Sequence, residues 1–410
     1  MTLSAPAAPP PASRHRDPYG VGLAYRFTVH REALAHRDEI DLLEISTEDY
    51  IVRERRTYAD PDERLLREAL SAFPCVAHGL SLSIGTVGEP PGHYLDATNR
   101  LLAETGMEVF SEHLAFHRVD GDDLTMFLAI PFEEAAVKWV AENYRFVRSR
   151  LGRPFALENV TYPFPVPHCP LDEAGFLRRV CEETDCTLLL DVTNVFNNSR
   201  NHGYDPVEFF ERLPMERVSQ MHLAGGFQHP NGRWEDSHSA PVMDEVWPLF
   251  DEAVRRAVNV RAIILERDSS LQPFDSVMDD LRKAREIFYS HRPLAAPFRE
   301  DLPPIADGIP APDPLAEDYA GLRGYQRALM GRIAKPAFRE AYRENAEQAA
   351  LEYGLADSVW LRRLADGDER SMRYFESSWD EFAKEDEEVA KEYEQREWAQ
   401  WAEQLGRGGW

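Results

Sequence analysis

The sequence predicts a (β/α)₈ barrel with a mostly helical extension at its C-terminal end. Eight short runs rich in β-branched and aliphatic residues recur between residues 20 and 268. Stretches with the apolar spacing of helices lie between them. Polar residues with reactive side chains stand near the C-terminal ends of the runs. Eight strand-then-helix units over roughly 270 residues are typical of a closed barrel. An open, doubly wound sheet is the alternative.

The expected strands and helices alternate along the chain. The eight expected strands are GVGLAYR (20–26), DLLEIS (41–46), CVAHGLSL (75–82), VFSEHLAF (109–116), PFALENV (154–160), TLLLDVTNV (187–195), VSQMHLAG (218–225) and AIILERD (262–268). Apolar residues that recur every three to four positions predict helices between and after these strands. The clearest of these helices are 62–73, 133–152, 172–184, 244–258 and 274–291.

The barrel is expected to occupy residues 18–291, with other segments on both sides. Residues 1–17 are rich in Ala and Pro, which predicts a disordered leader. Residues 292–317 are dense in proline and lack periodicity, which is typical of a linker. Residues 318–410 form an acidic helical extension that carries several tryptophans near its end. We expect this extension to dock onto the barrel or to bind a peptide or partner.

The charge and the apolar pattern exclude several classes of partner. The chain carries 72 acidic against 46 basic residues, for a net charge of -26. Such a surface repels nucleic acid and anionic membranes. No apolar run reaches the roughly 18 residues of a membrane span, and the leader lacks a signal-peptide core. A cytoplasmic location is therefore expected. The four cysteines show no C-x-x-C spacing, so neither a zinc ribbon nor a redox pair is indicated.

Six of the expected strands end in residues that bind metals or transfer protons. In a barrel, the C-terminal ends of all strands meet at one mouth. Several buried charges at that mouth would each cost several kcal/mol unless a cation compensated them. The pattern therefore predicts a metal site. The residues at these ends are His78, Glu112 with His113, Glu158 with Asn159, Asp191 with Asn194, His222 and Glu266.

The loop after the seventh strand adds the stretch Asp236-Ser237-His238. Alternate side chains of an extended segment share a face, so Asp236 and His238 point the same way and Ser237 points away. This geometry disfavours a Ser-His-Asp relay and favours two ligands of one ion. A single ion takes about six ligands, so the donors indicate two or three metals bridged by carboxylates. Because all donors are nitrogen or oxygen, iron, manganese and zinc all remain possible.

This succession of motifs resembles the multinuclear non-heme iron-dependent oxidative enzymes, which are relatives of the methanobactin-biosynthesis oxygenase. The motifs lie in the same order over residues 18–290. They are AHG at His78, SEHLAF at His113, LENV at Glu158, LDVTNVFNNSRNHGYDP at 190–206, MHLAGG at His222, DSHSAPV at His238 and LERD at Glu266. One departure is DVTN at Thr193, where the family more often has DVNN.

The resemblance implies a cofactor, a cosubstrate and a substrate. It implies two or three iron ions, dioxygen as cosubstrate, and a ribosomally made precursor peptide that is modified most often at a cysteine. It also implies a leader-recognition protein, which is separate or fused, and no nucleophile from the protein itself. The metal ligands it implies are His78, His113, Glu158, Asp191, Asn194, His222, Asp236, His238 and Glu266.

Further residues are expected to line the cavity or to support these ligands. Glu44, Glu48 and Tyr50 of EISTEDY match a stretch of the family and are interpreted as lining the cavity. The remaining expected substrate-contacting or supporting residues are Asn159, Asn198, His202 and Arg267. Two other functions stay open on the residues alone. They are a metal-dependent sugar isomerase or hydrolase, since such barrels also hold divalent ions at strand ends, and a metal-binding protein without catalysis.

Overall fold

The structure is a computed structural model that describes most of the chain. The described residues are 20–48, 63–88, 90–120, 122–162, 164–229, 232–291, 309–370, 372–373, 375–377 and 379–380. The expected leader 1–17, most of the expected linker and the tail from residue 381 onward lie outside the described residues. Tyr50 lies outside them as well.

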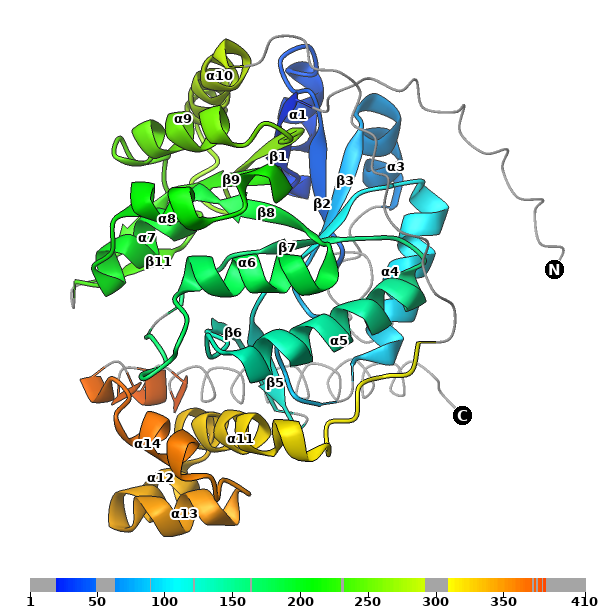
Figure 1. Ribbon diagram of the computed structural model, residues 1–410. Coiled ribbons are helices and arrows are strands. Elements are labelled where there is room, and N and C mark those ends of the chain that lie inside the picture. Colours follow the sequence, from blue (N-terminus) through cyan, green and yellow to red (C-terminus); the bar gives the residue numbers. More distant parts are fainter. Residues whose placement is uncertain are drawn as a thin grey trace, which may run out of the picture.

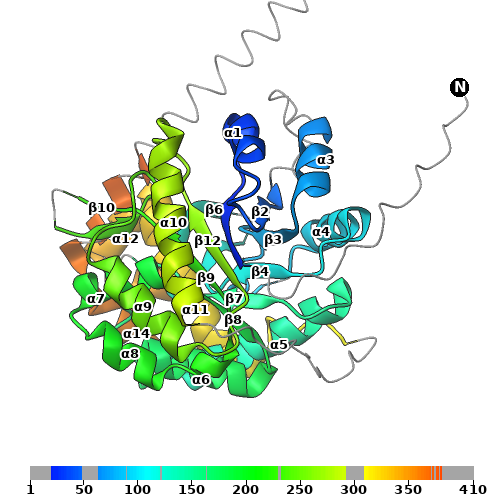
Figure 2. The same cartoon turned by 90° about the horizontal axis from the view of Figure 1, so that it is seen from above.

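Eight parallel strands close into a barrel, which confirms the predicted fold class and rules out an open sheet. Figure 2 shows the strands surrounded by a ring of helices. Each of the eight expected runs supplies one barrel strand. The strands, in their order around the barrel, are β1 (Gly20–Ala24), β12 (Ala262–Glu266), β9 (Val218–Ala224), β8 (Thr187–Asp191), β7 (Ala156–Glu158), β4 (Phe110–His113), β3 (Cys75–Gly79) and β2 (Leu43–Ser46).

The five expected helices of the barrel are present, and further elements were not predicted. The expected helices are α3 (Glu63–Ala72), α5 (Glu134–Leu151), α6 (Glu173–Thr184), α9 (Val246–Arg256) and α10 (Phe274–Ser290). The additional elements are α1 (His30–Ala35), α4 (Gly92–Thr105), α7 (Val192–His202), α8 (Pro206–Arg212), the hairpin β5 (Phe116–Val119) with β6 (Asp122–Leu128), and the hairpin β10 (Gly226–Gln228) with β11 (Trp234–Asp236). Across the described stretches, no helix is both long enough and apolar enough for a membrane crossing.

The expected sixth strand, 187–195, is shorter in the structure because α7 begins directly after Asp191. The Asp191 carboxylate accepts the backbone N–H of Asn194 at 2.6 Å. A carboxylate in this position satisfies a free N–H of the first helical turn and so starts the helix. The helix N-cap therefore fixes Asp191 at the mouth of the barrel.

The barrel interior has an apolar layer below a polar one. The apolar layer consists of Ala24, Leu42, Val76, Ala262 and Ile264, which are all buried. Side chains two positions apart in a strand share a face, so the next inward residues are Glu44, His78 and Glu266. A Cβ at Gly22 would lie 2.0 Å from the Leu42 carbonyl oxygen, so this position in β1 requires glycine.

The C-terminal region is helical where it is described, as predicted. Its elements are a short 3₁₀ turn (Glu317–Tyr319), α11 (Ala320–Ala334), α12 (Pro336–Glu344), α13 (Ala346–Glu352) and α14 (Ser358–Ala365). Figure 1 shows these helices in yellow and orange at one side of the barrel, beside α5 and β5. Buried Gln326 joins the two parts, because it accepts Val87 N–H at 2.8 Å and donates to the Gly85 carbonyl at 2.7 Å.

A buried carboxyl group at the start of α6 predicts a pH-dependent stability. Burial raises the pKa of Glu173 to about 8, against the hydrogen bonds from Tyr162, Asn198 and Tyr204. In the unfolded chain this group loses its proton near pH 4.5, so the folded state binds the extra proton between about pH 4.5 and 8. The free energy of unfolding therefore falls as the pH rises through this range.

Glu173→Gln is expected to stabilise the protein at pH 8.5 by a few kcal/mol, at roughly 1.4 kcal/mol per pKa unit. At pH 4.5 the variant and the wild type should have similar stability, because both then carry a neutral side chain. Thermal or urea unfolding of both proteins at the two pH values measures this difference. A stability difference that does not change with pH would contradict the assignment.

Candidate metal centre

A cavity of about 360 Å³ opens at the C-terminal ends of the strands. Its lining contains several of the residues that the sequence singled out. These are Glu44, His78, His113, Asn194, Asp236, His238 and Glu266. Glu158, Asp191 and His222 are buried next to these residues. Ion pairs join Glu158 to His78 and His222 to Glu266, and the possible donor atoms of Asp191 lie within 4.8 Å of those of Glu158, His222 and Glu266.

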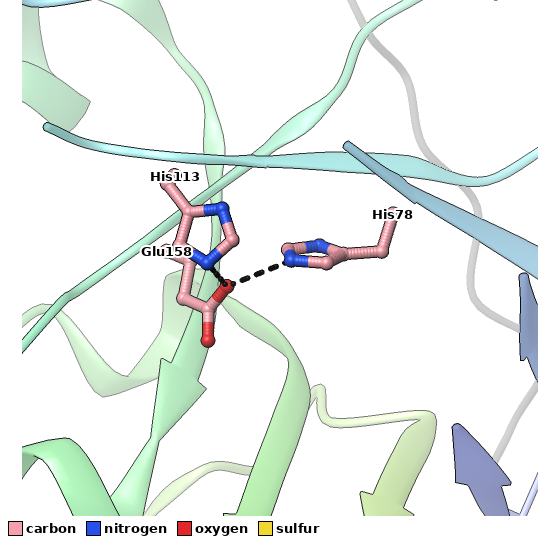
Figure 3. Close-up of side chains that lie close together, drawn as sticks. All are labelled: His78, His113 and Glu158. Carbon is pink, nitrogen blue, oxygen red and sulfur yellow. Dashed lines mark ion pairs between the residues drawn. The ribbon is translucent and has the colours of Figure 1, made fainter. Parts of the chain in front are cut away.

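The first group of possible ligands is His78, His113 and Glu158, which come from β3, β4 and β7 (Figure 3). Both imidazole Nε2 atoms lie 3.3 Å from Glu158 Oε2. The other ring nitrogens are held by the protein: His78 Nδ1 lies 2.9 Å from Ser111 Oγ, and His113 Nδ1 lies 3.0 Å from the Gly79 carbonyl oxygen. Such contacts fix the ring orientation of a metal-binding histidine. Both Nε2 atoms are therefore directed at one point.

The second group is Glu158, Asp191, His222 and Glu266, which are all buried and whose donor atoms lie within 4.8 Å of one another. His222 Nδ1 lies 3.1 Å from Glu158 Oε1 and 3.0 Å from Glu266 Oε2. Its Nε2 is paired with Glu44 Oε2 at 2.9 Å. Glu158 belongs to both groups, with one oxygen toward each. A carboxylate placed in this way can bridge two cations.

Asp236 and His238 adjoin the second group from the β10–β11 side of the mouth. His238 Nε2 lies 3.0 Å from Asp236 Oδ2 and 3.6 Å from Glu266 Oε2. The other ring nitrogen, Nδ1, is paired with Asp268 Oδ2 at 3.1 Å. Ser237 is turned elsewhere, and its hydroxyl lies 2.8 Å from that of Ser239. The structure thus brings the acid and the imidazole together and leaves the serine out.

Several atoms that point into this cluster lack a hydrogen bond. Within the part of the chain that the structure describes, these are Glu158 Oε2, Asp191 Oδ2, His222 Nδ1, Asp236 Oδ1 and His238 Nε2. Some of them lie close to an opposite charge, as given above, but without the alignment of a hydrogen bond. An unsatisfied buried polar group costs about 1–3 kcal/mol. Convergent oxygen and nitrogen atoms of this kind are the donor set of a divalent cation, so these residues fit a metal centre.

The pKa values of two buried carboxyl groups, Glu158 and Asp191, indicate a surplus of buried negative charge in the cluster. Burial raises the pKa of Glu158 to about 7, although His222 opposes this shift. The pKa of Asp191 also rises well above its usual value, first through burial and then through the charges of Asp236, Glu158 and Glu266. In contrast, burial lowers the pKa of His113 to about 3, which keeps the ring neutral and able to bind a cation.

Two further predicted residues line the cavity but are engaged with the protein. Glu44 pairs with His222, as described above. The Asn194 amide donates to the Asn159 carbonyl at 3.1 Å, and its oxygen accepts the Thr161 hydroxyl. Both ends of the Asn194 side chain are therefore hydrogen-bonded, which suits a residue that orients its neighbours.

Glu48, which was expected to line the cavity, makes hydrogen bonds within the protein. Its carboxylate accepts the Leu80 N–H and the Thr47 hydroxyl, both at 2.9 Å, and the residue is absent from the cavity wall. Asn159 is not in the wall either. It bonds the backbone N–H and carbonyl of Asp191 at 2.9 and 3.0 Å, and so holds the end of β8. Asn159 therefore has a supporting place.

Asn198, His202 and Arg267 also lie away from this cavity. Asn198 bonds the backbone of Tyr162 and Val160. The His202 ring stacks on Tyr162 at 4.3 Å, in the wall of a separate cavity. Arg267 is buried and donates to Asp280 at 2.6 Å, so its guanidinium is not available to a substrate carboxylate at the mouth. The sequence showed that these residues follow the ends of β8 and β12 but not which way their side chains face.

The apolar part of the cavity wall was not predicted. It includes Met126 and Phe127 from β6, Trp234 from β11, and Phe375 from the C-terminal region. Phe127 stacks on the His113 ring with 4.1 Å between ring centres. A run of alternating polar and apolar residues in 122–128 could have indicated β6, but nothing in the sequence places Phe375 at the mouth.

The contacts of the 236–238 stretch predict different effects for adjacent residues. His238→Ala is expected to lower the metal content and to weaken binding of the remaining metal, because it removes a donor next to Glu266. Ser237→Ala should leave the metal content within error of the wild type, since the hydroxyl bonds only Ser239 among the described contacts. Elemental analysis of both purified variants compares them. Equal metal loss in both would contradict the assignment.

The barrel part of the sequence matches a known protein family. Residues 20–289 match the family model described as "RiPP precursor modification enzyme MbnB/TglH/ChrH". The chain belongs to this family. The match covers the whole barrel and ends before the C-terminal helices. The family description names enzymes that modify RiPP precursors, and the buried cluster of His, Glu and Asp in this member is compatible with metal binding.

Curated relatives agree with the family assignment. A UPF0276 protein of Nitrosospira multiformis is 39% identical over 209 residues, which cover 51% of this chain and 73% of the relative. A UPF0276 protein of Acaryochloris marina is 31% identical over 274 residues, or 67% of this chain and 96% of the relative. Among solved structures, a sugar phosphate isomerase/epimerase from Parabacteroides distasonis matches 69% of this chain and 100% of its own, with a TM-score of 0.42 and 13% identity.

Proposed function

We propose that this protein is a multinuclear iron-dependent oxidase. It uses dioxygen to modify a ribosomally made precursor peptide at a cysteine. Membership of the RiPP precursor modification family supports the substrate class. The position of Glu158 carries the metal part of the proposal. Its two oxygens face two different groups of donors, which suits a carboxylate that bridges two ions.

The proposed ligands fall into three places around shared carboxylates. His78 and His113 face one oxygen of Glu158, and His222 faces the other. Asp191 belongs to the same group as His222, and Asp236 with His238 adjoin Glu266. Two or three iron ions fit this arrangement. Asn194, Glu44 and Asp268 hold the ligands in position. When bound, the iron would supply the redox chemistry with dioxygen, because no side chain of the cluster can do so.

The other residues of the cavity would bind and orient the peptide. The rings of Phe127 and Trp234 and the thioether of Met126 form an apolar wall above the polar cluster. Such a wall excludes water and holds a side chain of the peptide near the proposed metal ligands. This is catalysis by positioning. A cysteine is the favoured residue, because a thiolate is a strong ligand of iron and its bound form is stabilised there.

Co-expression with a short peptide encoded beside this chain's gene tests the proposal. The peptide is isolated from aerobic and anaerobic cultures, and its mass is measured. We expect a mass change that requires dioxygen and iron, with a loss of hydrogens for desaturation or cyclisation and a loss of carbon for excision. Tightly bound zinc or manganese without iron, together with turnover that does not need oxygen, would refute the oxidase. An unchanged peptide mass would refute the substrate.

A further inference from the structure

One residue of the cavity wall comes from outside the part of the chain that matches the family. The family model ends at residue 289, whereas Phe375 lies 86 positions further along the chain. Phe375 nevertheless lines the same cavity as His78, His113 and Glu266. The wall of the proposed active site is therefore completed by the C-terminal helical region.

Specific contacts fix this region at the mouth. The Arg233 guanidinium, next to β11, pairs with the carboxylate of Asp368. The Phe375 ring meets Phe164 edge-on, with 5.9 Å between ring centres. Because Arg233 and Phe164 lie in segments that follow barrel strands, these two contacts attach the segment from Asp368 to Phe375 to the mouth of the barrel.

Contacts farther from the cavity dock the same region on the barrel. Arg363 is buried and pairs with Glu133 at the start of α5. His168 Nε2 lies 2.7 Å from Asp366 Oδ2. Lys335 Nζ lies 2.7 Å from Asp122 at the start of β6. Several independent attachments indicate a fixed wall of the cavity.

The wall formed in this way is apolar and encloses a small space. Phe375 joins Met126, Phe127 and Trp234 above the polar cluster. The cavity volume of about 360 Å³ lies near the lower end of the roughly 300–1,000 Å³ of small-molecule sites. A bulky group bound at the proposed metal ligands would have to pass or contact the Phe375 ring. The size of the wall residues therefore determines which groups fit.

We propose that the C-terminal helical region is the substrate-selecting wall of this enzyme and that Phe375 is its specificity-determining residue. Phe375 limits the size of the substrate group that lies next to the metal-bound substrate atom. The chemical class selected is a thiol-bearing residue with a small neighbour. This inference rests on the proposed function, because it needs a metal bound by the proposed ligands.

Thiols of different size test the inference without turnover. The protein is loaded with Co²⁺ and titrated with 2-mercaptoethanol and with naphthylmethanethiol, and the sulfur-to-cobalt absorption band reports binding. In Phe375→Ala the affinity for naphthylmethanethiol should rise about 10-fold, which corresponds to about 1.4 kcal/mol. The affinity for 2-mercaptoethanol should change less than about two-fold, because a small thiol does not reach the removed ring.

Lys335→Met is the matched control, since it removes a docking contact of the same region away from the cavity. This variant should keep the wild-type ratio of the affinities for the two thiols. Phe375→Leu should give an intermediate change, and it replaces Phe375→Ala if thermal melting shows that the alanine variant is unfolded. Equal affinity ratios in wild type and Phe375 variants, or no thiol band in any of them, would overturn the proposal. Failure of the wild type to bind Co²⁺ would instead overturn the metal centre on which the proposal rests.

Discussion

Glu158→Gln is expected to reduce the bound iron from two or three ions per chain to less than one. The carboxylate lies 3.3 Å from two imidazoles with one oxygen and 3.1 Å from His222 with the other. Glutamine keeps the shape but offers a single neutral oxygen, so it cannot bridge two cations. Iron per chain is measured by elemental analysis after anaerobic loading with Fe²⁺.

This loss should not come from unfolding. Burial raises the pKa of Glu158, so the free carboxylate is unfavourable in the fold and a neutral side chain removes that cost. The unfolding temperature of metal-free Glu158→Gln should therefore equal or exceed that of the metal-free wild type. Glu173→Gln is the matched control, because Glu173 is also a buried glutamate with a raised pKa but lies outside this cavity. If both variants kept the full iron content, Glu158 would not be a bridge.

The second large effect is expected at Asp191, which has two separable roles. One oxygen caps α7 through the Asn194 N–H, and the other lacks a hydrogen bond and faces the cluster. Asp191→Asn keeps a good N-cap and should leave stability near that of the wild type without metal, while metal affinity falls at least 10-fold. Asp191→Ala should lose the metal to the same extent and also about 1 kcal/mol of stability.

The pair of Asp191 variants is compared by urea unfolding without metal and by metal titration. Equal stability of the Asn and Ala variants would show that the cap contributes nothing. Metal affinity at the wild-type level in Asp191→Asn would remove this residue from the proposed ligand set. The two roles are thus tested by different measurements on the same proteins.

The barrel could be predicted from the sequence because its parallel strands are buried on both faces. Their apolar runs, such as TLLLD and AIILE, stand out from the amphipathic helices that cover them. The end of β8 was misplaced for a physical reason. The apolar residues of DVTNV continue the run, but the Asp191 side chain satisfies the first turn of α7 and converts it to helix.

The candidate site could be predicted as far as strand ends determine it. His78, Glu158 and His222 follow from the rule that strand ends meet at one mouth. Whether a side chain faces the lumen depends on the pleat and on its partners, which explains why Glu48 and Arg267 lie elsewhere. The strands of the hairpin that carries Trp234 have three residues each, which is too short for a periodic signal.

The position of Phe375 could not be predicted because it depends on docking between segments far apart in the sequence. Polar contacts such as those of Gln326 with Gly85 and Val87 contribute to that docking. Each involves groups that are common in any helix or loop. Their pairing becomes visible only in three dimensions.

The iron content of the wild-type chain tests the central claim most directly. The protein is purified without metal, exposed anaerobically to a mixture of Fe²⁺, Mn²⁺ and Zn²⁺, and analysed for each element after removal of free ions. We predict two or three iron ions per chain in the wild type and less than one in Glu158→Gln. A single zinc or manganese ion per chain, or iron that stays at the wild-type content in Glu158→Gln, would contradict the proposed centre.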